Sequence, residues 1–201
     1  MPEIKLYEMA PTRSLRCRWT LAEAGLEYES LGGRPDIIGS DELKQFHPLG
    51  KLPAAIIDGK PLFESAAICT AIADLAPEKE LIAKPGTWGR ALHDQWTCYV
   101  LTEMEAWLWA SAVNTFVLPA EERIAEVLPQ CAKLFARGAA GLEAALSRSD
   151  YLVEDRFTVT DIIAGYTVNW AKGQDLLGDF PSLEAYLDRL LAREHCPLAE
   201  G

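Results

Sequence analysis

The chain has 201 residues, of which 49% are hydrophobic and 24% are charged, a composition typical of a soluble globular protein. It is long enough to bury a core in one or two domains. The formal net charge is −11 and the pI is about 4.8. Such an acidic surface argues against sequence-independent binding to nucleic acid or to anionic membranes, so we expect neither as a partner.

The five cysteines favour free thiols in a reducing compartment, because they are odd in number, widely spaced and without a Cys-x-x-Cys motif. No metal site is expected, since the three histidines lie far apart and none is spaced with a cysteine as zinc ligands are. Glu3 and Lys5 follow Met1 at once, and no apolar run approaches the length of a membrane span. We therefore expect a cytoplasmic protein.

Residues 1–75 alternate between strand and helix patterns. The first helical pattern starts at Ser14 and stops at Gly25, and Ser40 or Asp41 is suited to cap a short helix. In chain order we expect a strand at 4–7, a helix at 14–24, a strand at 26–31, a short helix at 41–46, strands at 54–57 and 60–63, and a helix at 66–75.

The segment from His47 to Ser65 carries the most specific local signals. Asp58-Gly59 is a strong hairpin signal between two short strands, and Pro53 stands at the entrance to the first of them. A proline cannot donate a hydrogen bond to a sheet, so it marks an edge or a turn, where a cis peptide is also accommodated. Glu64-Ser65 opens the following helix, whose unpaired N–H groups suit an anion. Together these features predict a socket for an extended, negatively charged, peptide-like ligand.

The motif Gly50-Lys51-Leu52-Pro53, followed by a hairpin and by Glu64-Ser65, resembles the glutathione-binding half of the glutathione transferase family. The resemblance implies a cis Pro53 and main-chain pairing between Leu52 and the cysteinyl unit of glutathione. It also implies that Glu64 and Ser65 hold the γ-glutamyl end. We therefore expect glutathione as a co-substrate, bound by Lys51, Leu52, Pro53, Glu64 and Ser65.

After the prolines and charges of residues 76–86 the chain is almost wholly helical in pattern. We expect long helical segments at 87–116 and 120–145, the second kinked at Pro129 or Gly138, and shorter helices at 162–171 and 182–194. Thr158 and Asp161 form a capping-box variant before the third of these helices. The resemblance assigns that box to folding and not to chemistry.

The resemblance now covers nearly the whole chain and implies the glutathione transferase fold, which is α/β plus all-α. Residues 1–77 are expected to form a thioredoxin-like βαβ–ββα domain that binds glutathione. Residues 78–86 would be a linker, and residues 87–201 an all-helical C-terminal domain. The resemblance also implies a twofold homodimer.

The loop before the first helix carries groups that favour a thiolate, which is the nucleophilic form of a thiol. Serine-type members of the family place the activating Ser four residues before an Arg, and here Thr12 stands four residues before Arg16. Thr12 is therefore a candidate donor to the thiolate, and Ser14 is the other unless it caps the helix. Arg13 stands where some relatives have Cys or Ser, and it either adds a cation beside bound glutathione or blocks the pocket.

Neighbouring residues have both a functional and a structural interpretation. Arg16 and Arg18 either supply positive charge near the thiolate or form surface or interdomain salt bridges. Tyr7 could replace the activating tyrosine of other classes, although packing within the strand is favoured. Cys17 is expected to be a structural thiol inside the helix. His47 either contacts the glycine end of glutathione or is a solvated loop residue.

An electrophilic second substrate is expected between the two halves, over the first loop and against the long helix. Tyr99, Met104, Trp107 and Trp109 lie at suitable distances along the chain. Residues at this helical spacing also serve in cores and in dimer interfaces, and the sequence leaves that alternative open.

These features predict a glutathione transferase of the detoxification type, which activates the thiol of glutathione for attack on an electrophilic small molecule. Because Thr12-Arg13 replace the expected residues, a non-catalytic binding or scaffold protein on the same fold is the main alternative. A glutathione-dependent isomerase similar to maleylacetoacetate isomerase is the third. The run from Ser14 to Arg18 resembles that class, but its Ser-Ser-Cys triplet is Pro11-Thr12-Arg13 here.

Overall fold

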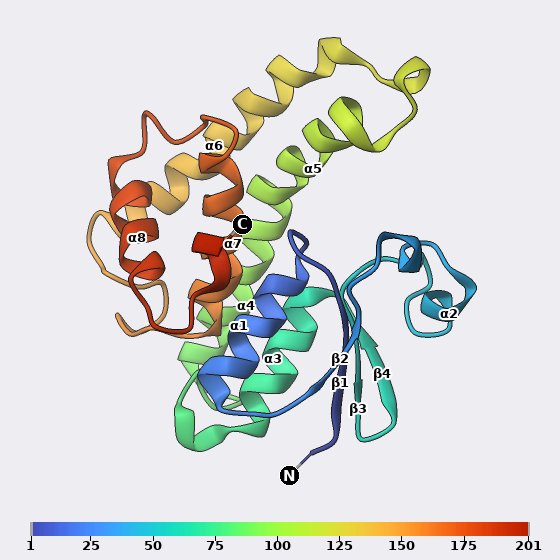
Figure 1. The fold of residues 1–201 in the computed structure, drawn as a ribbon. Coiled ribbons are helices and arrows are strands. Elements are labelled where there is room, and N and C mark those ends of the chain that lie inside the picture. The colour runs from blue at the N-terminus through green and yellow to red at the C-terminus, as the bar shows by residue number, and fades with distance from the viewer. Residues whose placement is uncertain (1, 201) are drawn as a thin grey trace. The chain divides into compact units, whose positions relative to one another are not determined.

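The computed structural model describes residues 2–200, which divide into two compact units. The first unit runs to Lys84 and also includes the chain from Leu191 onward, and the second comprises Pro85–Leu190. The end of the chain, which the sequence grouped with the helical half, thus folds with the N-terminal half. The predicted fold class is confirmed, because the first unit is a thioredoxin-like α/β unit and the second is all-helical (Figure 1).

The first unit is built on a four-stranded mixed sheet in the order β2-β1-β3-β4. Strand β1 runs parallel to β2 and antiparallel to β3, and β3 and β4 form an antiparallel hairpin. The hairpin turn falls on Asp58 and Gly59, which both have positive φ, as a tight two-residue turn requires. The strands are β1 (Ile4–Glu8), β2 (Glu29–Gly32), β3 (Ala54–Ile57) and β4 (Lys60–Phe63).

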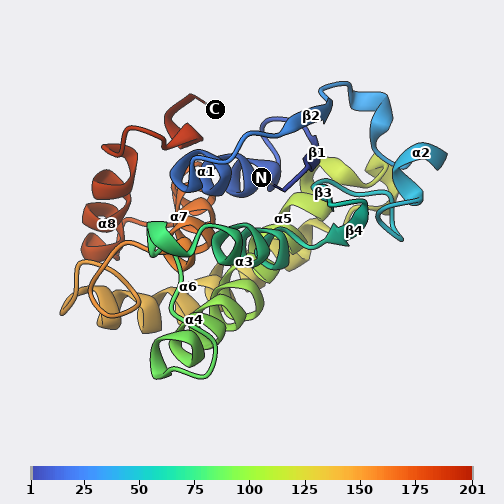
Figure 2. The same cartoon turned by 90° about the horizontal axis from the view of Figure 1, so that it is seen from below.

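Two helices, α1 (Ser14–Ala24) and α3 (Ser65–Leu75), pack together on one face of this sheet, while α2 (Asp41–Lys44) lies on the other side (Figures 1 and 2). Side chains alternate along β1, so Leu6 faces α1 and α3, whereas Tyr7 packs with Leu43 of α2. Helix α1 ends at Gly25, whose left-handed conformation suits a residue without a side chain. Ser40 caps α2, as one of the two predicted candidates.

Strand β2 begins three residues later than the sequence predicts. Its pairing with β1 starts at Glu29 opposite Lys5, whereas the N–H of Leu26 still bonds to the carbonyl of Leu21 in α1. The predicted strand at 26–31 was therefore wrong at its start, because the helix end holds that backbone group.

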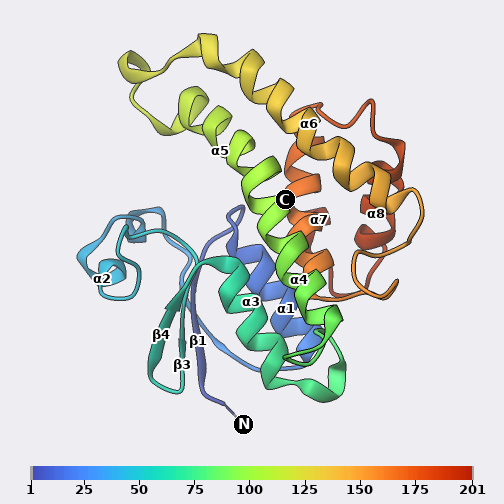
Figure 3. The ribbon, with the colours of Figure 1, turned by 180° about the vertical axis from the view of Figure 1, so that it is seen from behind.

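The second unit is helical throughout its described elements. A continuous helical run from Trp88 to Val117 contains two π-helical turns, and α6 packs beside it (Figure 3). The elements are α4 (Trp88–Tyr99), a π turn (Val100–Glu105), α5 (Ala106–Ala112), a π turn (Val113–Val117), short 3-10 turns (Ala120–Glu122 and Ala125–Val127), α6 (Leu128–Leu146), α7 (Val159–Lys172) and α8 (Pro181–Leu191).

The predicted long helix at 120–145 was wrong at its start and at its kink. Helix α6 begins only at Leu128, and Pro129 lies in its first turn, where a missing N–H costs nothing. Gly138 does not interrupt the helix but allows it to approach Glu103 closely. The capping box of α7 is confirmed, since Thr158 and Asp161 make both of its reciprocal bonds.

Across residues 2–200, none of the helices combines the length and the apolar character needed to cross a membrane.

Candidate functional site

The loop between β1 and α1 holds the candidate thiol-activating residues. Arg13 occupies the N-cap position of α1 without a capping bond from its side chain, and Ser14 is the first residue of the helix. The alternative that Ser14 is the N-cap was therefore wrong. Instead, the N–H of Ser14 donates to Thr12 Oγ1 at 3.2 Å, so Thr12 provides the side-chain acceptor at this helix start.

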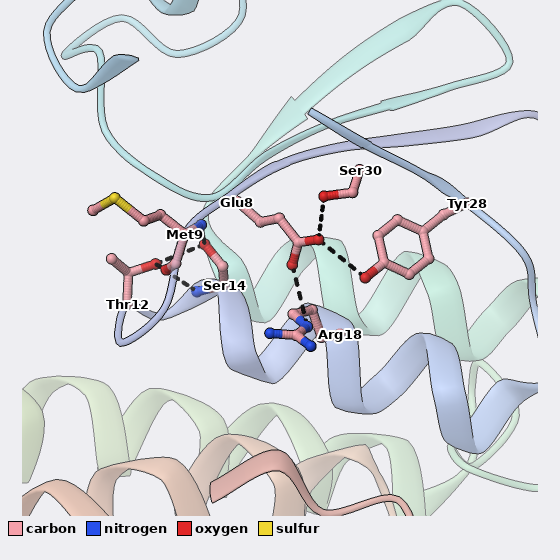
Figure 4. A network of polar contacts seen from close by, with 7 residues as sticks. All are labelled: Glu8, Met9, Thr12, Ser14, Arg18, Tyr28 and Ser30. Atoms are coloured by element: carbon pink, nitrogen blue, oxygen red, sulfur yellow. Dashed lines mark hydrogen bonds and ion pairs between the residues drawn. The ribbon is translucent and has the colours of Figure 1, made fainter. Parts of the chain in front are cut away.

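Thr12 and Ser14 share a compact hydrogen-bond network with the main chain of Met9 (Figure 4). The Thr12 hydroxyl donates to the Met9 carbonyl at 2.5 Å, and its oxygen lies 2.7 Å from Ser14 Oγ. Because a hydroxyl has one hydrogen, and that of Thr12 is used on Met9, Ser14 must donate to Thr12. Ser14 in turn accepts the N–H of Met9 at 3.4 Å. In this arrangement both hydroxyl hydrogens are engaged.

Burial separates the two hydroxyls. Ser14 is completely buried, whereas Thr12 is half-buried. A ligand at the start of α1 can therefore reach Thr12 and not Ser14 in this conformation. Arg13, also half-buried, has interactions of its own in the structure.

The start of α3 forms the second part of the candidate site. Glu64 precedes the helix with a φ of 70°, a conformation that is uncommon for a residue with a side chain and often marks a functional position. Ser65 follows as the first helical residue and is 5% exposed. Its hydroxyl accepts a hydrogen bond from Arg16 Nη1 at 3.1 Å. Since Arg16 lies in α1, this bond joins the starts of the two helices.

The entrance to β3 forms the third part. The peptide bond between Leu52 and Pro53 is cis, as the resemblance implied. Pairing between β3 and β4 begins at Ala54, so the main-chain groups of Leu52 take no part in that ladder. Lys51 is exposed and Pro53 is buried. The edge backbone that the sequence assigned to peptide binding is thus outside the sheet hydrogen bonding.

Several structural alternatives are now decided. Arg16 is completely buried and donates to Ser65, so it is not a surface residue, whereas Arg18 forms the predicted kind of salt bridge, with Glu8 inside the first unit. Burial raises the pKa of the Cys17 thiol, which keeps that sulfur protonated and structural. Tyr7 packs on Phe46 and donates its hydroxyl to Glu42.

His47 is 5% exposed, so the solvated-loop alternative was wrong for it. Its Nδ1 accepts the N–H of Leu49 at 3.1 Å, and its ring lies against Phe63. Burial lowers the pKa of His47, which favours the neutral imidazole at neutral pH.

The candidate second-substrate residues lie in the helical unit and have different environments. Met104 is completely buried and packs in the core of that unit, so its assignment to a substrate surface needs correction. Tyr99 donates its hydroxyl to the carbonyl of Gly138 at 2.8 Å, which ties it to α6. Trp107 and Trp109 are half-buried, and the indole N–H of Trp107 is buried without a hydrogen-bond partner among the described residues.

Sequence reasoning missed Glu8, the last residue of β1. Alternation along the strand places it on the same face as Ile4 and Leu6, which both pack in the core. A carboxylate on that apolar face was the available signal, because a buried charge normally has a partner. Its partner, Arg18, lies too far along the chain to be assigned from spacing.

Among the described residues, no cluster of His, Cys, Asp or Glu could hold a metal ion. The candidate site therefore offers hydroxyls, main-chain groups, two helix starts and a buried guanidinium. These groups suit an anionic peptide-like ligand with an ionisable sulfur.

Two family profiles match the chain, one in each unit. The N-terminal domain of glutathione S-transferases matches residues 2–74, and the C-terminal domain of glutathione S-transferases matches residues 124–189. The chain belongs to the glutathione S-transferase family. As a glutathione S-transferase it is an enzyme that uses glutathione as a co-substrate. The predicted family and enzyme class are therefore confirmed.

Individual relatives of this glutathione S-transferase are distant but cover nearly its full length. Protein LigF of Sphingobium sp. strain SYK-6 is 29% identical, with 94% of this chain and 90% of LigF covered. The crystal structure of LigF, described as a beta-etherase, has a TM-score of 0.80 at 26% identity and covers 98% of each chain. A glutathione transferase from Methylococcus capsulatus has a TM-score of 0.84 at 27% identity and covers 98% of this chain and 96% of its own.

Proposed function

We propose that this glutathione transferase attaches glutathione to an electrophilic carbon of a small molecule, with Thr12 as the donor to the thiolate. The observation that carries the proposal is the network at the start of α1. Thr12 is accessible, its oxygen accepts from Ser14, and its hydrogen rests on the Met9 carbonyl.

Three groups of the first unit would hold glutathione. Leu52 offers main-chain groups outside the β3–β4 ladder, and Ser65 offers a hydroxyl at the positive start of α3. Arg16 orients that hydroxyl and adds a charge that does not titrate near neutral pH. Glu64, Pro53, Lys51 and Arg13 remain proposed contacts from the family motif.

Thr12 would activate the thiol by a small change. Rotation about its Cβ–Oγ1 bond moves the hydroxyl hydrogen from the Met9 carbonyl to the sulfur, while the oxygen stays in place. Ser14 continues to donate to that oxygen, and a hydroxyl that accepts a hydrogen bond is a stronger donor. Ser14 is thus a positioning residue in this proposal, and the hydrogen bond from Thr12 lowers the pKa of the bound thiol.

Glutathione supplies the sulfur nucleophile for the reaction. The thiol of glutathione first loses its proton to solvent. The thiolate then forms a carbon–sulfur bond with the electrophilic carbon of the second substrate, as the bond between that carbon and its leaving group breaks. Water must be kept from the electrophile during this step. With Met104 buried in the core, Trp107 and Tyr99 are the candidate residues of the helical unit that we propose contact the electrophile.

Ether cleavage is a second candidate reaction, favoured by the full-length similarity to LigF, whose structure is described as that of a beta-etherase. The same thiolate would attack the carbon that bears the ether oxygen, and the oxygen would leave as an alkoxide or phenoxide that takes up a proton. This candidate uses the same residues of the first unit.

We also propose a homodimer, a cytoplasmic location and a role in detoxification. Exposed apolar side chains in the first unit, including Leu49 and Phe63, support an interface between copies of the chain. Sedimentation equilibrium gives the mass that decides this point, and a monomer mass at micromolar concentration would contradict the dimer.

The function is tested by retention on immobilised glutathione, followed by conjugation assays with an aromatic halide and with a β-aryl ether. We expect Thr12→Ala to lower kcat by about 10- to 100-fold with little change in the KM for glutathione, since a hydrogen bond to a charged group is lost. Thr12→Ser should retain most of the activity. Ser65→Ala should raise the KM for glutathione by about tenfold and leave kcat largely unchanged.

Thr102→Ala is the matched control, because Thr102 is exposed and its hydroxyl donates to the carbonyl of Cys98 in its own helical run. It should behave like the unsubstituted protein. Equal loss of kcat and of glutathione affinity in Thr12→Ala would contradict its role as a thiolate donor. Retention without turnover on either substrate would favour a scaffold, and an absence of retention would remove the proposal altogether.

A further inference from the structure

A buried carboxylate lies at the end of β1, directly before the loop that carries Thr12. Glu8 is 8% exposed, and its Oε1 accepts hydrogen bonds from Ser30 Oγ at 2.6 Å and from the Tyr28 hydroxyl at 3.0 Å (Figure 4). Its Oε2 lies 3.4 Å from Arg18 Nε in α1. That second oxygen is buried and has no well-formed hydrogen bond within the described chain. The ion pair with Arg18 is therefore the main interaction that offsets the cost of burying it.

The charge of Glu8 is paired with that of Arg18. Tyr28 faces Glu8 from the residues that lead into β2, and Cys17 faces it from α1. Burial raises the pKa of both groups, aided by the Glu8 charge for Tyr28 and mainly by the hydrogen bond with Cys69 for Cys17, so each is neutral near pH 7. Arg18 is therefore the paired counter-charge of this buried carboxylate, and the buried guanidinium of Arg16 also acts on the neighbouring Cys17.

The ion pair between Glu8 and Arg18 also joins the two ends of the loop that carries Thr12, residues 9–13. Glu8 is the residue before Met9, whose main chain holds both Thr12 and Ser14, and Arg18 lies one helical turn after Ser14. The main chain of Glu8 is itself fixed, because its carbonyl accepts the N–H of Gly33 at 3.0 Å. The segment from Met9 to Arg13 is thus anchored at both ends.

We propose that Glu8 and Arg18 are positioning residues for the reaction, holding the 9–13 loop in place and setting the charge balance beside the bound sulfur. This inference rests on the proposed function, since it concerns the thiolate stabilised at Thr12. Neither residue needs to touch glutathione for this role.

The proposal predicts opposite effects for the two members of the pair. Without the Glu8 charge, Arg18 is left uncompensated and favours the anionic sulfur. Without the Arg18 charge, Glu8 is left uncompensated and disfavours it. A residue with a purely structural role would shift both variants in the same direction or leave the thiol pKa unchanged.

The test measures the pKa of glutathione bound to the enzyme, from the ultraviolet absorbance of the thiolate and from the pH profile of kcat/KM. Glu8→Gln should lower that pKa and Arg18→Gln should raise it, each by about 0.5 pH unit, the order of magnitude for one charge acting through partly hydrated protein. The double variant should return near the original value. Arg18→Lys keeps the charge and should also stay near it.

Glu23→Gln is the matched control, because Glu23 lies at the far end of α1 and is paired with Arg193 at 2.8 Å. Glu23→Gln removes one carboxylate charge, as Glu8→Gln does, from the helix that carries Arg18, and it should leave the thiol pKa unchanged. Shifts in the same direction, no shift, or an equal shift in Glu23→Gln would overturn the inference alone. If the unsubstituted protein forms no thiolate from bound glutathione, the proposed function itself fails, and the inference falls with it.

Discussion

Thr12 and Ser14 carry the same chemical group two residues apart, and only their surroundings distinguish them. Thr12 lies before the helix and is half-buried, whereas Ser14 is the first helical residue and is completely buried. The sequence named both as candidates but could not rank them, because a shift of one residue in the helix start decides which side chain turns inward. The assignment of chemistry to Thr12 stays a prediction until its variants are assayed.

Asp161 is the most constrained carboxylate of the helical unit. Four donors converge on it, from the N–H groups of Leu152 and Thr158 and from the hydroxyls of Thr158 and Tyr186. Burial nevertheless outweighs these hydrogen bonds and raises the pKa of Asp161 to about 6. A carboxyl group with a raised folded-state pKa stabilises the protein at low pH, and that contribution is lost as the pH rises through the folded value.

Asp161→Asn should therefore destabilise the protein in a pH-dependent way. The amide puts an NH₂ group against donors, so the free energy of unfolding should fall by about 2 kcal/mol or more at neutral pH. The loss should be larger at about pH 4.5, where Asp161 of the original protein is mostly protonated and contributes more than it does at neutral pH. Urea unfolding at both pH values, followed by tryptophan fluorescence, measures the difference.

Asp188→Asn is the control for this experiment, because the Asp188 side chain is 71% exposed and forms a surface ion pair with Lys172. It should change the free energy of unfolding little at either pH. A loss in Asp161→Asn that is smaller in acid than at neutral pH would contradict the raised pKa.

At the scale of elements, the contact between α6 and the helical run of residues 88–117 depends on two glycines. A side chain added at Gly138 would clash with the main-chain carbonyl of Glu103, and one added at Gly141 would meet the hydroxyl of Tyr99. The sequence suggested a kink at Gly138, yet α6 runs unbroken from Leu128 to Leu146. A glycine in a helical pattern marks either a bend or a close approach, and only the neighbouring helix decides between them.

Gly138→Ala should consequently destabilise the helical unit, although alanine is the better helix former. The rigid carbonyl cannot move aside as a flexible side chain would, so we expect the free energy of unfolding to fall by about 2 kcal/mol or more. Gly178→Ala, in the same unit, is the control, because apart from its own chain neighbours no atom lies within 4 Å of the added methyl group. Equal stability of the two variants in chemical denaturation would refute the close-packing explanation.

At the scale of the whole molecule, the chain returns to its first unit at the end. Arg193 makes two hydrogen bonds of 2.8 Å to Glu23, which lies near the end of α1. Although burial opposes ionisation, the hydrogen bonds from Arg193 and Trp19 lower the pKa of Glu23. A lowered carboxyl pKa stabilises the folded state above the unfolded value, and this contribution is lost as the pH falls through the folded value.

Arg193→Gln should reduce the free energy of unfolding of the first unit by about 1 kcal/mol at neutral pH, since a bidentate pair is lost from a partly buried site. The difference from the original protein should shrink in acid, as the pH falls through the lowered pKa of Glu23 and the carboxylate becomes protonated. Lys172→Gln, which removes an exposed pair with Asp188, should have almost no effect. A loss from Arg193→Gln that is unchanged in acid would show that the contact, and not the charge, is what stabilises the chain end.

The sequence by itself determined the features that depend only on the backbone conformation of a few consecutive residues. The Asp58-Gly59 turn, the stop of α1 at Gly25 and the capping box at Thr158 and Asp161 were all predicted and are confirmed, because each follows from local backbone geometry. The tertiary structure alone decided which side chains are buried and what they meet there. Glu8 with Arg18, Ser14 behind Thr12, and Gly138 against Glu103 join groups whose proximity depends on how whole elements pack, and no spacing along the chain encodes that distance.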